Sequence, residues 1–94
     1  MNLQQLRVLV AVVEHQSFTL AAQELAMTQP AVSQHIRALE RYCRIRLVDR
    51  SKGRVVPTPA GERLCRTAAT VLQVYDEAER VVCDLRSSAS SCAS

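Results

Sequence analysis

The sequence predicts a mainly α-helical fold with a short β-hairpin, and three observations support this fold class. First, aromatic residues make up 3% of the chain and glycine occurs twice, a composition that disfavours a β-sandwich. Second, several stretches of apolar residues at helical spacing begin with a capping residue. Third, the longest regular apolar pattern lies in the last third of the chain. With 94 residues, the chain has room for a single small core.

The first two predicted helices each begin with a capping residue, and the second helix is short. Asn2 is placed to cap the first helix, and Gln5 follows three positions later, as in a capping box. Ser17 is placed to cap the second helix. Because Ala21 and Ala22 are small, this second helix allows another helix to approach closely.

The third predicted helix begins after Thr28 and has two distinct faces. Pro30 falls in its first turn, where the missing N–H costs nothing. Its buried side is predicted to carry Val32, Ile36, Leu39 and Cys43. Its exposed side and flank carry Gln29, Pro30, Ser33, Gln34, Arg37 and Arg41. Amide, hydroxyl and guanidinium groups near a helix N-terminus are suited to reading base edges in DNA.

A three-residue segment, 26–28, separates the second and third predicted helices. Two helices joined by so short a turn form a helix-turn-helix unit. An ordinary solvated face is the alternative interpretation of the polar side of the third helix. The tandem arrangement favours DNA over this alternative.

A β-hairpin is predicted after the third helix. Residues 45–50 suggest a short strand, 51–53 a tight turn with a basic tip, and 54–56 a return strand that Pro57 stops. A hairpin in this position is a wing. We expect its basic residues to contact phosphates, which gives affinity and orientation but little sequence information: Arg50, Lys52 and Arg54.

Positive charge is concentrated in the middle of the chain. The net charge is +3. Residues 28–56 carry seven basic and two acidic residues, whereas the stretches before and after them each have a net charge of −1. This distribution indicates a polyanionic partner, with a solvated surface as the alternative.

The last predicted helix begins at Pro59, after a Thr58 cap, and runs to residue 86, a length of about 42 Å. Its apolar residues are spaced alternately by four and three positions, the pattern of a coiled-coil seam: Leu64, Ala68, Val71, Tyr75, Ala78, Val82 and Leu85. Such a seam needs a partner, and a second copy of the chain is the simplest one. Packing against its own domain is the alternative, above all for the first half. Residues 87–94 are predicted to form a flexible tail.

The sequence lacks the motifs that several classes of function require. The chain has no glycine-rich phosphate loop, paired carboxylate site or HExxH motif, so we expect no catalytic residues and no enzyme activity. The four cysteines, Cys43, Cys65, Cys83 and Cys92, form no CxxC or Cys/His cluster, so we expect no metal and no cofactor. No signal segment or membrane-spanning apolar run is present, which predicts a cytoplasmic protein.

At this point the residues resemble a known family. In order along the chain come Ser17-Phe18-Thr19, Ala21-Ala22, Leu25, Thr28-Gln29-Pro30-Ala31-Val32-Ser33, Ile36, Leu39-Glu40, Leu47, Arg50 and Thr58-Pro59-Ala60-Gly61. From about residue 2 to 61, this pattern resembles the N-terminal DNA-binding domain of LysR-type transcriptional regulators. The resemblance implies a winged helix-turn-helix and a homodimer held by paired linker helices. It also implies binding to an interrupted palindrome of double-stranded DNA.

Carried over by position, the resemblance implies three groups of DNA-binding residues. The major groove would be met by Gln29, Pro30, Ala31, Ser33, Gln34 and Arg37. Phosphates would be met by Ser17 or Thr19 and by Thr28. The wing would use Arg50, Lys52 and Arg54. The expected organisation is a DNA-binding domain over 1–57, a dimerising linker helix over 58–87 and a tail over 88–94.

The chain departs from the family pattern in sequence and in length. Cys43-Arg44 stands where the family usually has Leu-Gly, and Val48 stands where it usually has Phe. A left-handed Arg44 would cost roughly 1 kcal/mol, or the turn differs. The family's effector-binding domain does not follow the linker helix here, so we expect no small-molecule site in this chain. The sequence leaves open whether the chain is an excised domain or naturally short.

The leading hypothesis is therefore a dimeric, sequence-specific DNA-binding module of a transcriptional regulator. The alternative is an interaction module that pairs with full-length regulators through its coiled-coil arm without reading DNA. That module would need the seam but not the exposed polar residues of the third helix. The sequence does not give the operator, the direction of regulation or the oligomeric state beyond a dimer.

Overall fold

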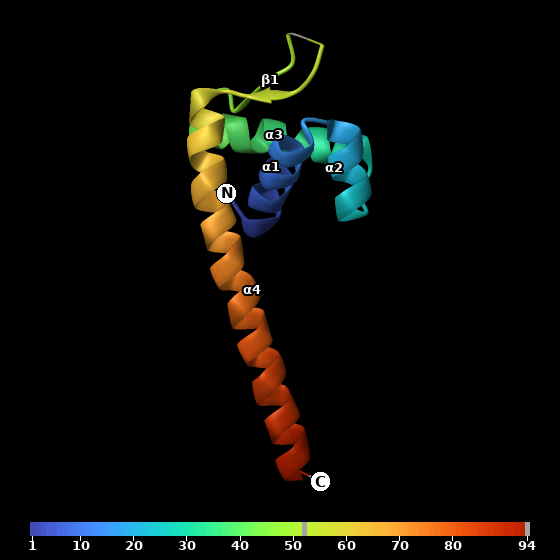
Figure 1. The fold of residues 1–94 in the computed structure, drawn as a ribbon, viewed down its shortest axis with the longest axis vertical. Coiled ribbons are helices and arrows are strands. Elements are labelled where there is room, and N and C mark those ends of the chain that lie inside the picture. Colours follow the sequence, from blue (N-terminus) through green and yellow to red (C-terminus); the bar gives the residue numbers. More distant parts are fainter. Residues whose placement is uncertain (52, 94) are drawn as a thin grey trace.

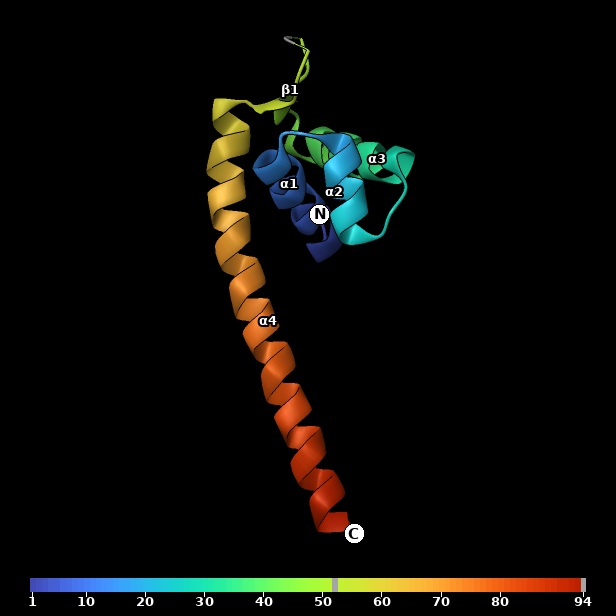
Figure 2. The same cartoon turned by 45° about the vertical axis from the view of Figure 1, so that its right-hand side comes forward.

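The computed structural model describes residues 1–51 and 53–93 and shows a small helical head from which one long helix extends (Figure 1). The elements are α1 (Leu3–His15), α2 (Phe18–Leu25), α3 (Gln29–Cys43), β1 (Val48–Asp49), β2 (Val56–Pro57) and α4 (Pro59–Ala93). The molecule is 58 Å long and 24 Å by 19 Å across. In the turned view of Figure 2, the C-terminal part of α4 still extends away from α1, α2 and α3. No helix within the described residues is both long and apolar enough to span a membrane.

The predicted helix caps are confirmed. Asn2 Oδ1 accepts the Gln5 N–H at 2.8 Å, and Gln5 Oε1 accepts the Asn2 N–H at 3.2 Å, which completes a capping box. The hydroxyls of Ser17 and Thr28 each accept the backbone N–H three residues further on, at 3.1 and 3.2 Å. These local bonds set where α1, α2 and α3 begin.

The same three helices end at non-glycine residues in the left-handed conformation. The φ angles are 51° at Gln16, 54° at Ala26 and 59° at Arg44. The Arg44 N–H donates to the Glu40 carbonyl oxygen at 2.7 Å, which closes the last turn of α3. The left-handed turn considered for Arg44 is therefore present, with arginine in a position that suits glycine.

The core lies between α1, α2 and α3. The predicted buried side of α3 is confirmed, because Val32, Ile36 and Leu39 are fully buried and Cys43 packs half-buried against the core. Val48, 1% exposed, joins this core from β1. The buried aliphatic side chains fix one face of α3, so its opposite face is turned to solvent.

The wing is shorter than the sequence predicted. β1 and β2 are two residues each and pair antiparallel, Val48 with Pro57 and Asp49 with Val56. Ile45 lies outside β1 and is 53% exposed, and Pro57 lies inside β2 rather than stopping it. Proline is tolerated there because a two-stranded hairpin has open edges that need no N–H donor.

Glu40 explains why β1 starts late. Its carboxylate accepts the backbone N–H groups of Leu47, at 2.8 Å, and Val48, at 3.3 Å. The Leu47 N–H, directly ahead of β1, is therefore bonded to α3, while the Leu47 carbonyl oxygen accepts the N–H of Thr58, directly after β2, at 3.0 Å. The contact with Glu40 attaches the wing to the third helix.

The start of α4 crosses the wing closely. Thr58 Oγ1 accepts the Gly61 N–H at 3.0 Å and donates to the Arg46 carbonyl oxygen at 2.7 Å, so the predicted Thr58 cap is confirmed. A Cβ atom on Gly61 would overlap the carbonyl oxygen of Leu47. Glycine is therefore required for α4 to pass this close to the wing.

The helix α4 is longer than predicted. It was expected to end near residue 86, before a flexible tail, but it remains helical through Ala93 and measures about 52 Å. No glycine or proline occurs between residues 62 and 93, so nothing in this stretch interrupts the helix. Its first half packs against α1, where Leu6, Ala68 and Leu72 form a small buried cluster.

Candidate nucleic-acid interface

One side of α3 combines exposure with the residue types that read DNA. Pro30, Gln34, Arg37 and Arg41 are all exposed, at spacings of four, three and four positions that place them on one stripe. Gln29 is exposed at the start of the helix, while Ala31 and Ser33 lie half-buried on its flank. The structure therefore leaves the amide and guanidinium groups of Gln34 and Arg37 free of the core.

The N-termini of α2 and α3 add hydroxyl groups to this surface. Ser17 and Thr28 use a hydroxyl oxygen to accept the cap bond. Each keeps its hydroxyl hydrogen available for an acceptor. Thr19 is exposed in the first turn of α2. Helix N-termini favour negative charge, so this arrangement suits phosphate groups.

Arg50 connects the wing to both helices. Its guanidinium carbon lies 4.0 Å from the centre of the Phe18 ring, and its Nη2 donates to Ser33 Oγ at 3.3 Å. Phe18 is 6% exposed, so the arginine covers a ring that belongs to the core. The sequence predicted Arg50 as a phosphate contact and missed this stacking. The only sign of this stacking in the sequence was an aromatic residue, Phe18, directly after the Ser17 cap.

The remaining predicted wing residues are placed differently. Arg54 is exposed, beyond the strand pair. Lys52 lies outside the described residues. The tip of the wing is shaped by Asp49, whose Oδ1 accepts the N–H of Ser51 at 2.8 Å and its hydroxyl at 2.7 Å.

The predicted dimer seam is divided between two environments. Ala68 is 1% exposed and packs within the chain, and Leu64 also packs against the core, because α1 covers this part of α4. Leu72 completes this intramolecular contact and was missed, although it lies one turn after Ala68. Further along, the other predicted seam residues are exposed: Val71, Tyr75, Ala78, Val82 and Leu85.

The exposed part of α4 forms a continuous apolar stripe. Val74 and Val81, exposed by 60% and 52%, lie beside the predicted seam residues and widen the stripe. At 100° per residue, no charged residue between positions 71 and 85 falls inside it. We call the set Val71, Val74, Tyr75, Ala78, Val81, Val82 and Leu85 the α4 stripe.

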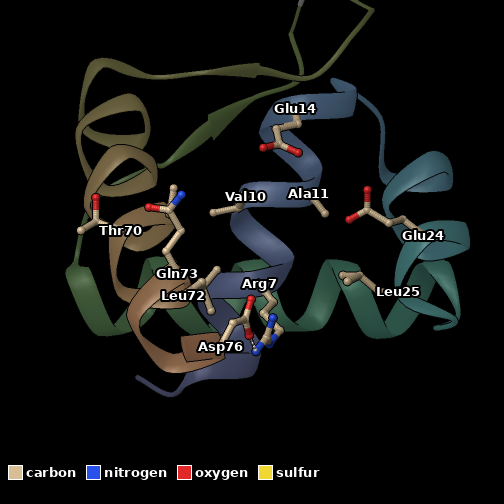
Figure 3. A pocket seen from close by; sticks show the side chains of 11 residues that line it. Arg7, Val10, Ala11, Glu14, Glu24, Leu25, Thr70, Leu72, Gln73 and Asp76 are labelled. Atoms are coloured by element: carbon tan, nitrogen blue, oxygen red, sulfur yellow. Dashed lines mark hydrogen bonds and ion pairs between the residues drawn. The ribbon is translucent and has the colours of Figure 1, made fainter. Parts of the chain in front are cut away.

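An open hollow lies between α1, α2 and α4 (Figure 3). Glu14, Glu24 and Asp76 line it together with Arg7. Arg7 Nη2 donates to Asp76 Oδ1 at 3.0 Å, and its guanidinium lies 5.6 Å from the centre of the Tyr75 ring. With three carboxylates against one guanidinium, this hollow repels phosphate and is not part of the candidate interface.

Comparison with known proteins identifies the family of the region that contains the exposed side of α3 and the wing. Residues 3–62 match the model of the family described as "Bacterial regulatory helix-turn-helix protein, lysR family". Among curated proteins, the chain is 40% identical over 79 residues to the HTH-type transcriptional regulator CfxR of Cupriavidus necator. That match covers 84% of the chain and 25% of CfxR.

A second relative is the probable RuBisCO transcriptional regulator of Cyanophora paradoxa. It is 42% identical over 85 residues, which cover 90% of the chain and 26% of the relative. The chain thus spans about a quarter of the length of these two curated relatives.

Solved structures give the same result. The BenM DBD, in a crystal structure with catB site 1 DNA, matches with a TM-score of 0.83 and 39% identity, over 87% of this chain and 91% of that chain. A full-length OxyR variant from Pseudomonas aeruginosa matches with a TM-score of 0.84 and 30% identity, over 87% of this chain and 28% of that one. The predicted winged helix-turn-helix architecture is therefore confirmed.

Proposed function

Because the chain belongs to the LysR family of bacterial regulatory helix-turn-helix proteins, we propose that it is a sequence-specific DNA-binding module of a transcriptional regulator. The observation that carries this proposal is the exposure of Gln34 and Arg37 on one stripe of α3, opposite the buried Val32, Ile36 and Leu39. The BenM DBD, which has a similar fold, was solved with DNA. The alternative of an interaction module that does not read DNA gives no reason for this polar stripe.

In the proposed complex, the N-terminal turns of α3 enter the major groove. The residues that would meet base edges there are Gln29, Pro30, Ala31, Ser33, Gln34 and Arg37. Glutamine pairs with adenine and arginine with guanine through two hydrogen bonds each. The neighbouring hydroxyls and the wing would hold the backbone: Ser17, Thr19, Thr28, Arg50, Lys52 and Arg54.

Arg50 has a second role in this proposal. Its stacking on Phe18 and its hydrogen bond to Ser33 hold the wing and the reading helix in one relative position. The wing then needs little rearrangement to follow the backbone while α3 lies in the groove. Binding affinity is higher when the wing and α3 are already held in their bound arrangement, because less conformational entropy is lost on binding.

We propose that the α4 stripe pairs two copies of the chain. An apolar stripe without charge over four helical turns is costly to leave in water, and a second copy offers the same surface in a two-fold arrangement. Two reading helices related in this way would bind half-sites of an interrupted palindrome, spaced by about one helical turn of DNA or a multiple of it. Sedimentation at micromolar concentration tests the pairing, and a monomer would contradict it.

The proposed role is binding rather than catalysis, without a metal or cofactor, and it places the chain in the cytoplasm with bacterial DNA. The regulators to which the chain is similar are named for transcription control. The organisation that we propose keeps 1–57 as the DNA-binding domain and assigns residues 58–87 to dimerisation. Because α4 begins under the wing, its first turns also belong structurally to the head.

Two arginines separate base reading from backbone contact. We expect Arg37→Ala to weaken binding to a selected DNA site by about 1–3 kcal/mol and to relax one position of that site. Arg54→Ala should weaken binding to all sequences alike and flatten its salt dependence. Both are measured by titrating the selected duplex and a random duplex at several salt concentrations. Equal losses on both duplexes for both variants would contradict the assigned roles.

A further inference from the structure

A second basic surface lies at the C-terminal end of α3. An open hollow there is lined by Arg37, Arg41, Arg44, Ile45 and Arg46 around Glu40. All four arginines are exposed. Of these, only Arg37 belongs to the base-reading residues proposed above. Arg41 continues the same exposed stripe of α3, and no DNA contact has been assigned to Arg41, Arg44 or Arg46. We call Arg41, Arg44 and Arg46 the α3-end cluster.

The single carboxylate in this hollow does not neutralise the cluster. The side chain of Glu40 is 15% exposed and accepts the backbone N–H groups of Leu47 and Val48. Only Arg46 lies near it, with 3.7 Å between Arg46 Nε and Glu40 Oε2. In the described part of the chain, no carboxylate forms an ion pair with Arg41 or Arg44. The hollow therefore carries a net positive charge that faces solvent.

Arg44 adds a positive charge at the end of α3 that packing does not require. Its φ angle of 59° lies in the left-handed region, where glycine would be unstrained. Its side chain is exposed and is not part of the core. Packing therefore gives no reason for an arginine at a strained helix end. An exposed cation that binds an anionic partner gives one.

The length of α3 allows the cluster to lie beside the DNA backbone. With 15 residues, α3 is about 22 Å long, whereas the major groove is about 12 Å wide. When the N-terminal turns of the helix contact base edges, its C-terminal end is long enough to reach the edge of the groove, where the phosphates lie. Arg41 lies on the same stripe as Gln34 and Arg37, so the cluster continues the reading surface.

We propose that the α3-end cluster binds a phosphate group of the DNA backbone at the edge of the major groove read by α3. This inference rests on the proposed function and adds a contact site outside the residues assigned to it. Arg44 contributes charge to this site. An acidic protein surface is the competing partner for such a cluster, but the continuity with the reading stripe favours DNA.

Because Arg44 has a left-handed backbone, a glycine substitution there removes the charge without destabilising the fold. Arg44→Gly removes the charge and relieves the left-handed backbone, so its melting temperature should equal or exceed that of the unsubstituted chain. Arg44→Lys keeps the charge. Arg80→Ala removes one positive charge from an exposed position of α4 outside the α4 stripe and serves as the matched control.

Each chain is titrated with a selected and a random duplex between about 50 and 200 mM salt. Loss of one phosphate contact lowers the salt slope by about 0.9, so the advantage of the unsubstituted chain over Arg44→Gly should shrink about threefold across this range. The loss should be equal on the two duplexes, and Arg44→Lys should keep the slope. Arg80→Ala should bind like the unsubstituted chain.

An Arg44→Gly chain with an unchanged slope and affinity would overturn the proposal and leave the cluster to an acidic protein surface. A loss as large in Arg80→Ala would also overturn it, because net charge alone would then account for the effect. If the unsubstituted chain binds neither duplex at any salt concentration, the proposed function itself fails. That result is distinguishable from failure of the α3-end cluster proposal, in which the unsubstituted chain binds DNA but Arg44→Gly changes neither affinity nor salt slope.

Discussion

Residues 59–72 and 73–93 of α4 form one continuous helix but meet different surroundings (Figure 1). In the first half, Gly61, Ala68 and Leu72 are buried against the wing and α1. In the second half, every residue from 73 to 88 is exposed in the single chain. The same helical periodicity thus serves intramolecular packing first and an open surface afterwards. A heptad pattern in a sequence therefore does not by itself show whether a given helical turn packs within the chain or stays exposed.

The largest expected effect concerns Gly61 in the first half. In an exposed helix, replacing glycine by alanine stabilises by about 1 kcal/mol. At Gly61 the added Cβ would overlap the carbonyl oxygen of Leu47, so Gly61→Ala should instead lower the free energy of unfolding by about 2–3 kcal/mol. Urea unfolding measures this change. A variant as stable as the unsubstituted chain would show that the helix can move away from the wing at little cost.

A matched pair of leucines sharpens the comparison. Leu72 is 8% exposed and Leu85 is 64% exposed. Leu72→Ala should lower the free energy of unfolding by about 2 kcal/mol at every protein concentration. Leu85→Ala should weaken dimerisation, and its effect on unfolding should vanish on dilution to the monomer. Unfolding at several concentrations, with sedimentation, separates the two, and equal behaviour would mean that the halves are not distinct.

The smallest expected effect is a difference in thiol reactivity. Burial, and secondarily the charge of Glu14, raise the pKa of the Cys65 thiol. Less reactive thiolate is therefore present at a given pH, and a higher pH is needed to form it. Cys83, in the second half, is exposed. Iodoacetamide labelling mapped by mass spectrometry should modify Cys83 before Cys65 at neutral pH. Unfolding in urea should make the two rates equal, and equal rates in the folded chain would contradict the difference.

The sequence predicted the features that depend on local chemistry. The caps at Asn2, Ser17, Thr28 and Thr58, the order of the helices and the buried side of α3 all follow from side chains within one or two turns of each other. The exposure of the reading stripe was predicted for the same reason. Once three aliphatic residues fix the buried side of a helix, its opposite side is fixed too.

Contacts between distant residues were not predicted. Arg50 and Phe18 are 32 positions apart, and the Leu47 carbonyl is 14 positions from Gly61, so no local pattern connects them. The strand limits were wrong because a carboxylate from α3, that of Glu40, takes the N–H groups at the start of β1. The predicted end of α4 was wrong because residues 87–93, which are mostly serine and alanine, contain no glycine or proline to interrupt the helix.

The left-handed ends of the first three helices have a consequence for fragments of this protein. Gln16, Ala26 and Arg44 each adopt a backbone conformation that costs about 1 kcal/mol relative to glycine. Local preference therefore opposes all three turns, and only the assembled core keeps them in place. A synthetic peptide of residues 17–43 should be largely unfolded in water and bind duplexes without base selectivity, since it lacks α1. A minimal DNA-binding fragment of this protein therefore needs to retain α1, although no DNA contact is proposed for that helix.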